Sequence, residues 1–163
     1  MRLTMIFVVL LLTACATTPP IETAGTDKNL TPDRALANSE AARGQRAAWG
    51  GMIVNTKNLK DATEIEVLGL PLAKDTRPDR DGNPQHRFLL IRAGYLEPSD
   101  YRNGRLVSAV GTVEGMRNGQ VGEAAYTYPV LRAEQIYLWP SGEDTGRNSN
   151  INFGIGVGVI FGR

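Results

Sequence analysis

The chain has 163 residues, 42% of them apolar, with 18 basic residues, 17 acidic residues, one cysteine and one histidine. This length and apolar content suit one domain with a hydrophobic core. A nearly neutral chain lacks the basic surface that nucleic-acid binding needs, so we expect no nucleic-acid partner. One cysteine excludes an internal disulfide, and one cysteine plus one histidine cannot supply the ligands of a typical zinc site. We therefore expect no metal and no cofactor.

The first fifteen residues predict a secretory signal followed by a lipid-attachment site. Arg2 precedes an apolar run at residues 3–12 that is broken only by Thr4. Such a run after a positive charge is typical of a signal peptide, and it is too short to span a bilayer. The ending LTAC at residues 12–15 resembles the bacterial lipobox. We therefore expect cleavage after residue 14 and acylation of the Cys15 thiol.

Acylation of Cys15 would place the protein in a membrane. Each buried methylene group contributes about 0.8 kcal/mol, so several acyl chains hold a protein durably. Ala16 follows the cysteine, where similar lipoproteins retained in the inner membrane carry aspartate. The sequence therefore predicts a lipid anchor in the outer membrane of a Gram-negative cell, with the domain in the periplasm. Cleavage would also remove Arg2 and leave 17 basic and 17 acidic residues.

Residues 15–45 are expected to form a lipidated tether and a short helix. Residues 16–30 have little apolar periodicity, which is typical of a linker. Thr31 is then a good N-cap and Pro32 a good first helical residue. The predicted helix continues to about Arg43 and stops at Gly44.

From residue 46 to residue 140 the pattern indicates β-structure. We expect strands at residues 49–54, 63–68, 87–91, 106–113, 126–128 and 130–139. The glycine pair in the first of these suggests a bulge or a sharp bend. No alternation of strands with helices appears, which argues against a doubly wound fold. The prediction is a mainly β fold, a small OB-like β-barrel with a short N-terminal helix, or alternatively a small β-sandwich.

A set of short blocks along the β region resembles the Slp family of starvation-inducible outer-membrane lipoproteins. The blocks keep their order and spacing over about residues 45–140. They are Trp49-Gly50-Gly51-x-Ile53-Val54, Asn58, Thr63-x-Ile65-Glu66-Val67-Leu68, Pro71-Leu72, Arg87-Phe88, Leu96-Glu97-Pro98, Tyr101-x-x-Gly104-Arg105, Val110-Gly111-x-Val113, Gly122-Glu123, Tyr126-x-Tyr128-Pro129-Val130 and Leu138-Trp139-Pro140.

The resemblance implies an outer-membrane lipoprotein associated with starvation or stationary phase, with no known catalytic residues. Cys15 is the only functional position that it carries over. Two departures accompany the match. Ala48 stands where the family often has a basic residue before the tryptophan, and the segment after Pro140 lies outside the shared pattern.

Candidate catalytic and metal-binding residues are few. Residues 79–83, DRDGN, resemble part of a calcium-binding loop. The full pattern fails, because Arg77 and Phe88 would occupy the first and twelfth positions, which require carboxylates. We interpret this segment as a polar loop between strands. His86 has no nucleophile motif beside it and is expected to be structural. Glu64 and Glu66 are expected to lie on a solvated strand face, opposite the inward Ile65 and Val67.

The aromatic residues could form a stacking platform with a basic groove, as in oligonucleotide-binding barrels. Core packing is the favoured interpretation, and a small ligand remains an alternative. The aromatic residues are Trp49, Trp139, Tyr95, Tyr101, Tyr126, Tyr128 and Tyr137, and the arginines are Arg87, Arg92, Arg105 and Arg132.

The C-terminal segment, residues 141–163, contains a glycine-rich run in which large apolar and small residues alternate at residues 151–161. It predicts a strand that covers the barrel or an edge. Alternatively, it is a strand that contacts the membrane or self-associates, since its length matches a tilted transmembrane strand. One strand cannot span alone, so that alternative requires a homo-oligomer.

Taken together, these patterns predict a non-enzymatic, lipid-anchored β module with a role in envelope structure or stress adaptation. An oligomeric pore or ring and a periplasmic small-ligand-binding module are the alternatives.

Overall fold

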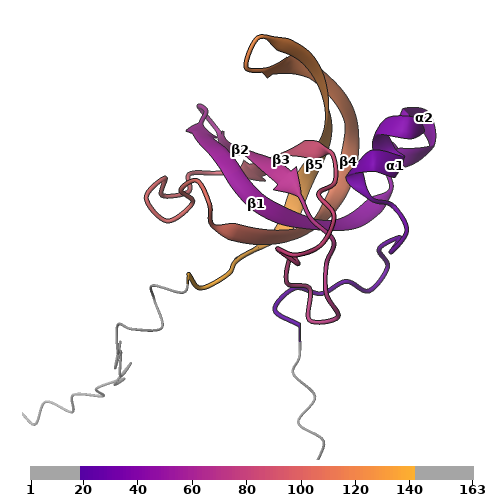
Figure 1. Ribbon diagram of the computed structural model, residues 1–163, viewed down its shortest axis with the longest axis horizontal. Helices are drawn as coiled ribbons and strands as arrows, with labels where there is room; N and C mark the ends of the chain where they lie inside the picture. Colours follow the sequence, from indigo (N-terminus) through magenta and orange to yellow (C-terminus); the bar gives the residue numbers. More distant parts are fainter. Residues whose placement is uncertain (1–18, 142–163) are drawn as a thin grey trace, which may run out of the picture.

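The computed structural model describes residues 19–141, as two short helices followed by five strands (Figure 1). Cys15, the signal at residues 1–14 and the predicted tail strand lie outside the described residues. Within residues 19–141, no helix is long and apolar enough to cross a membrane. The elements are α1 (Pro32–Ala37), α2 (Ser39–Ala42), β1 (Arg46–Asn58), β2 (Ala62–Gly69), β3 (Arg87–Ala93), β4 (Leu106–Val121) and β5 (Ala124–Leu138).

The five strands form a closed barrel with the order β1-β2-β3-β5-β4. Strand β1 pairs with both β2 and β4, and every pairing is antiparallel except the parallel β3–β5 pair. A five-stranded barrel in which one long strand pairs at both edges is the OB-like arrangement. The predicted mainly β, OB-like fold is confirmed, and the alternative β-sandwich is wrong because the sheet closes on itself.

Side-chain alternation along the strands fills the barrel interior. Ile65 and Val67 point inward from β2 and are fully buried, as their spacing predicts. Their β3 partners Leu90 and Phe88 are equally buried. The ring of Phe88 meets Trp49 of β1 edge-on, with the centroids 5.2 Å apart, so an aromatic pair forms the centre of the core.

The glycine pair of β1 permits a close approach of neighbouring strands and is not itself a bulge. A Cβ added at Gly51 would lie 1.9 Å from the carbonyl oxygen of Leu68 on β2. The irregularity in the β1–β2 pairing instead falls between Ile53 and Asn55. The predicted bulge is therefore present three residues further along the strand.

The predicted helix is confirmed in place and in its cap, although it is broken in two. The Thr31 side chain accepts a hydrogen bond from the backbone N–H of Arg34, and Pro32 begins α1. Asn38 ends α1 and caps α2, where its side chain accepts from Ala41 N–H. Ala35 and Ala42 are buried in the main core cluster. The two helices thus lie against the barrel beside β4 (Figure 1).

Candidate functional site: a covered sheet face and a pocket at the N-terminal segment

Strands β4 and β5 continue beyond the barrel as a long hairpin, which we call the arm and define as residues 116–129 (Figure 1). The pairing of β4 with β5 shifts between Val113 and Gly115, and Gly115 has a φ of 131°. A positive φ is a conformation that glycine adopts without strain. This irregularity lies at the base of the arm, where β4 leaves the barrel.

The arm packs against the outer face of β3. Phe88 and Leu90 point into the barrel, so their neighbours Leu89 and Ile91 point outward, yet both are buried. They form a second apolar cluster with Tyr128 and with further residues of β5, β4 and β2. The outer face of this part of the sheet is therefore covered by the chain itself.

Polar contacts hold the arm at this face. Arg117 of the arm forms an ion pair with Glu64 of β2. The Tyr128 hydroxyl donates to Glu66 at 3.2 Å, and Glu66 also pairs with Arg87 at 2.8 Å. Glu64 and Glu66 face outward, as expected, but they are half-buried and ion-paired instead of freely solvated, because residues distant in sequence lie over both carboxylates.

The environment of Tyr128 changes its acidity. Burial, followed by the negative charge of Glu66 and the hydrogen bond to it, raises the pKa of Tyr128 to about 12. The phenol therefore keeps its proton, which it donates to the Glu66 carboxylate. Its oxygen also lies 3.0 Å from the Gln120 carbonyl within the arm.

His86 lies just before β3 and its contacts are structural. Its ring stacks on Tyr126 with the centroids 4.5 Å apart, and its Nε2 atom lies 2.8 Å from the carbonyl of Thr127. Its backbone N–H donates to the Asp33 carboxylate in α1. These contacts agree with the predicted structural role, and no nucleophile is among them.

The aromatic residues do not gather into one platform. Trp49, Tyr128 and Trp139 are only 2%, 4% and 8% exposed, whereas Tyr95 is 68% exposed. Trp49 belongs to the barrel core, Trp139 to a small cluster with Leu70, and Tyr128 to the arm contact. Core packing is therefore confirmed for these three rings, and it is wrong for Tyr95, whose ring is exposed. The remaining rings pack half-buried against the clusters: Tyr101, Tyr126 and Tyr137.

The arginines considered for a basic groove have other contacts. Arg87 pairs with Glu66, and Arg132 pairs with Glu114 at 2.6 Å. Arg105 donates to the carbonyl of Trp139 at 2.9 Å, and Arg92 to the carbonyl next to it in sequence. They are dispersed over several contacts and do not line a common groove.

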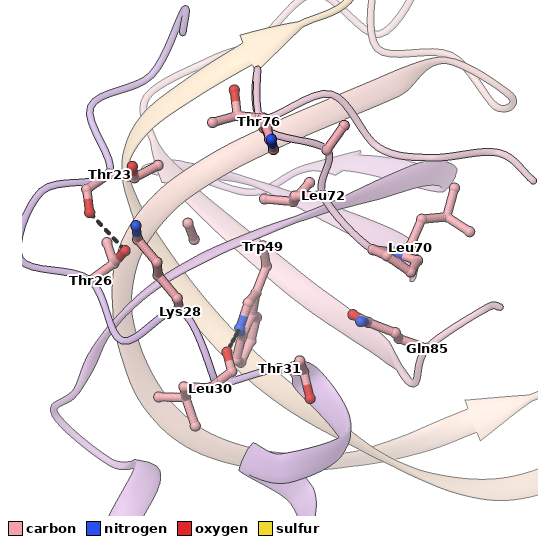
Figure 2. A pocket seen from close by; sticks show the side chains of 14 residues that line it. Thr23, Thr26, Lys28, Leu30, Thr31, Trp49, Leu70, Leu72, Thr76 and Gln85 are labelled. Carbon is pink, nitrogen blue, oxygen red and sulfur yellow. Dashed lines mark hydrogen bonds between the residues drawn. The ribbon is translucent and has the colours of Figure 1, made fainter. Parts of the chain in front are cut away.

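A pocket of about 510 Å³ lies between the segment at residues 23–31 and the loop that follows β2 (Figure 2). Figure 2 shows Thr23, Thr26 and Lys28 on one side and Leu70, Leu72 and Gln85 on the other. This volume is in the range of small-molecule sites, which run from about 300 to about 1,000 Å³. The lining residues are Thr23, Thr26, Lys28, Leu30, Thr31, Ala48, Trp49, Leu70, Pro71, Leu72, Ala73, Lys74, Thr76 and Gln85.

Two local contacts build this pocket. The Trp49 indole N–H donates to the carbonyl of Leu30 at 2.6 Å, which holds the N-terminal segment against β1. On the opposite side, a Cβ added at Gly50 would lie 2.8 Å from the Leu72 side chain. The glycine therefore lets the loop after β2 approach the sheet.

Thr76 in the wall of the pocket has a strained backbone. Its φ is 71°, and it is the only non-glycine residue with positive φ among residues 19–141. A β-branched residue in this region is a genuine outlier. Its side chain is buried, at 5% exposure, and its hydroxyl has no hydrogen-bond partner within the described part of the chain.

The sequence predicts no metal site in the described part of the chain, and the loop at residues 79–83 is the one candidate considered for calcium. Within residues 19–141, no group of three or more His, Cys, Asp or Glu side chains could hold a metal ion. Residues 79–83 lie in the loop between β2 and β3, as predicted, where the Asp79 carboxylate accepts from Asp81 N–H at 3.0 Å.

The residues that carry the family resemblance largely build the fold. Asn58 and Thr63 share a hydrogen bond of 2.5 Å beside the β1–β2 turn. Asn58 also donates to the Leu96 carbonyl, and Leu96 N–H donates to Thr63. These bonds join the β1–β2 turn to the β3–β4 loop, so the pattern predicts architecture and not a reaction.

The closed OB-like sheet, its covering arm and the adjoining pocket define a small β-barrel domain. The model of the outer membrane lipoprotein Slp family matches residues 12–154. The chain belongs to this family. The match extends past residue 140, into the segment that we expected to lie outside the shared pattern. The predicted outer-membrane lipoprotein localisation is confirmed by this membership.

Two relatives from Escherichia coli are similar to this chain in sequence. Outer membrane protein Slp of Escherichia coli (strain K12) is 32% identical over 115 residues, which cover 70% of this chain and 61% of that relative. The lipoprotein YeaY of the same organism is 30% identical over 134 residues, 80% of this chain and 67% of YeaY. The chain thus spans about three fifths of the length of the first relative.

Among solved structures, the mitochondrial single-stranded DNA binding protein Rim1 of S. cerevisiae is similar with a TM-score of 0.39 and 18% identity. The aligned region covers 61% of this chain and 98% of the Rim1 chain. A similarity this small carries no argument about function.

Proposed function

We propose that the protein is a non-enzymatic lipoprotein, held at the outer membrane by acyl chains on Cys15, that presents an OB-like barrel to the periplasm. Its role would lie in envelope structure or in adaptation to starvation. The observation that supports this most directly is the family match, which begins at residue 12 and so includes the lipobox-like ending before Cys15.

The geometry of the barrel supports a role without nucleic acid. OB-folds bind oligonucleotides at the face of their second and third strands. Here that face carries Glu64 and Glu66 and is covered by the arm. Carboxylates repel a phosphate backbone, and the arm occupies the space that stacked bases would need.

Replacement of the cysteine tests the anchor. Cys15→Ser should abolish incorporation of labelled palmitate and leave the protein outside the outer-membrane fraction, because serine lacks the thiol that carries the lipid. Thr13→Ser is the matched control, because it keeps a small residue before the cleavage point and should leave labelling intact. Continued palmitate labelling of the Cys15→Ser protein would refute the assignment.

The stress role needs a separate test. A strain that lacks the gene should lose viability in prolonged stationary phase, and the wild-type gene should restore it while the Cys15→Ser gene should not. Equal survival of all strains would contradict the stress role and leave the anchor untouched.

A second candidate function is a periplasmic ligand-binding module, supported by the pocket of about 510 Å³ beside the N-terminal segment. An oligomer built through the C-terminal segment stays a prediction. Deletion of residues 145–163 should reduce the particle size in detergent if that prediction holds.

A further inference from the structure

The lining of the pocket has a definite chemical character. It contains two lysines, four threonines and one glutamine, and no carboxylate. A site for a cation or an amine would normally offer an acidic side chain. The polar part of this pocket therefore favours an anion.

The remaining lining residues are apolar. In Figure 2, Leu70 and Leu72 lie on one side, Trp49 lies at the centre and Leu30 lies below it. Lys28, Thr23 and Thr26 lie on the opposite side (Figure 2). One wall thus suits a hydrocarbon group and the other suits a charged head, which is the lining that an amphipathic molecule needs.

None of the four lysines in residues 19–141 takes part in an ion pair, and Lys28 and Lys74 are the two that line the pocket. Arg46, Arg87, Arg117 and Arg132 are each paired with a glutamate. Within residues 19–141, neither Lys28 nor Lys74 has an ion-pair partner, and both are exposed. Their charge is available to a molecule that enters the pocket.

The strained loop adds an independent observation. Thr76 holds a left-handed backbone conformation that is strained for a β-branched residue, and such strain clusters at ligand sites. Its carbonyl accepts from the Ser108 hydroxyl at 2.6 Å, and Ser108 in turn accepts from the Trp139 indole at 2.9 Å. The core therefore holds the loop in the shape that forms the pocket wall.

From these observations we infer that the pocket binds an amphipathic anion, a carboxylate or phosphate group attached to a hydrocarbon chain. Lys28 and Lys74 contact the anionic head, and the wall of Leu70 and Leu72 contacts the chain. This inference deepens the ligand-binding candidate above and does not depend on the stress role.

The anion could come from two sources. Thr23 is eight residues beyond Cys15, and eight extended residues reach at most about 28 Å. A lipid anchor at Cys15 would therefore keep the pocket near a bilayer surface, where an acidic lipid headgroup is one source. A free fatty acid in the periplasm is the other.

The test uses the full-length lipidated protein in phosphatidylcholine nanodiscs and three probes with one chain length. Octanoate, octan-1-ol and octylamine are titrated by calorimetry, with empty nanodiscs subtracted. Octanoate should bind saturably and octylamine should not. Octanol binding as tight as that of octanoate, or octylamine binding, would overturn the inference, because the head charge would then have no attractive role.

Variants locate the site. Lys28→Gln combined with Lys74→Gln should weaken octanoate binding by roughly tenfold or more. Lys57→Gln combined with Lys60→Gln is the control, since it removes the same charge outside this pocket and should change little. If both double variants weaken octanoate binding equally, the effect comes from the net charge of the protein, and the proposed site is refuted. Ala73→Trp, which places a large ring at the pocket, should reduce octanoate binding while both lysines remain.

Nanodiscs with added phosphatidylglycerol distinguish the sources. If the lipid headgroup occupies the pocket, octanoate should bind more weakly in these discs than in phosphatidylcholine discs, and the loss should disappear in the Lys28→Gln, Lys74→Gln protein. Unchanged octanoate affinity would support a free amphipathic anion. The lipidation assay with Cys15→Ser is independent, so failure of the pocket and failure of the anchor give different results.

Discussion

The indole N–H of Trp49 donates a hydrogen bond of 2.6 Å to the carbonyl of Leu30. Trp49 lies in the barrel core, whereas Leu30 belongs to the segment that precedes the first helix. The same ring packs on Phe88 inside the barrel. One side chain therefore joins the core, the N-terminal segment and the pocket wall, so that the pocket depends on the barrel being folded.

Trp49→Phe should reduce the free energy of unfolding by about 1–3 kcal/mol, because the Leu30 carbonyl loses its donor and the core loses ring volume. Hydrogen exchange should become faster at residues 21–31. Trp139→Phe is the control, because its indole bonds Ser108 and not this segment. Faster exchange at residues 21–31 in both variants would contradict the specific role of Trp49.

The raised pKa of Tyr128 predicts an alkaline loss of stability. Because the folded pKa, about 12, exceeds the ordinary value of 10.0, the folded protein retains its proton when the unfolded chain has lost it. Stability should therefore fall as the pH rises from about 10 towards about 12. Denaturation in urea at pH about 9 and about 11.5 should show a smaller fall for Tyr128→Phe than for the wild type. Equal falls would show that other groups cause the effect.

Glu66→Ala should loosen the arm, because it removes the partner of both Tyr128 and Arg87. We expect a loss of about 1–2 kcal/mol in unfolding free energy and faster hydrogen exchange in residues 116–129. Glu134→Ala removes a more exposed ion pair with Arg46 and should stay within about 0.5 kcal/mol of the wild type. Similar losses of unfolding free energy in Glu66→Ala and Glu134→Ala would mean that the arm over Glu66 does not contribute to stability.

Gly51→Ala should disrupt the barrel, because its Cβ would lie 1.9 Å from the Leu68 carbonyl oxygen. The β1–β2 pairing must separate, and we expect a loss above about 3 kcal/mol or failure to accumulate as folded protein. Gly104→Ala, where φ is 84° and the space is open, should cost only about 1–2 kcal/mol from backbone strain. The melting temperatures of the two variants compare the cost of steric overlap with the cost of backbone strain. A smaller decrease for Gly51→Ala than for Gly104→Ala would contradict the close approach of β1 and β2 at Gly51.

Thr76→Gly should be neutral or stabilising by up to about 1 kcal/mol. Glycine relieves the positive φ and removes the unsatisfied hydroxyl, while its greater freedom in the unfolded chain offsets part of the gain. Chemical denaturation measures the difference. A loss of more than about 1 kcal/mol would show that the buried side chain contributes more than the strain costs.

Local patterns predicted most of the framework. The Thr31 cap, the inward Ile65 and Val67, and strands near their observed positions all follow from spacing and side-chain type. The predicted strands are shorter than β4 and β5, because the arm contains polar residues and glycine, which do not indicate a strand. Contacts of the arm with distant β-strands stabilise its pairing. The two segments expected on either side of Pro129 are therefore one continuous strand.

Contacts between residues far apart in the sequence could not be predicted from local patterns. Glu64 and Glu66 have the alternation of an exposed face, and only the fold brings Arg117, Arg87 and Tyr128 over them. The pocket likewise combines Lys28 with Lys74 and Thr76, from segments without a shared motif. No spacing rule connects such residues, because closure of the barrel sets their distance.

The neutral composition, the single cysteine in its lipobox-like setting and the order of the family blocks are properties of the sequence alone. The cysteine and its setting led to the membrane location, the blocks led to the family, and the strand pattern led to the OB-like class, because each depends on residue types close together in the chain. The covered sheet face and the unpaired lysines of the pocket were decided by the tertiary structure. Antiparallel pairing of the arm and the hydrogen bond between Trp49 and Leu30 place together groups that no local preference connects.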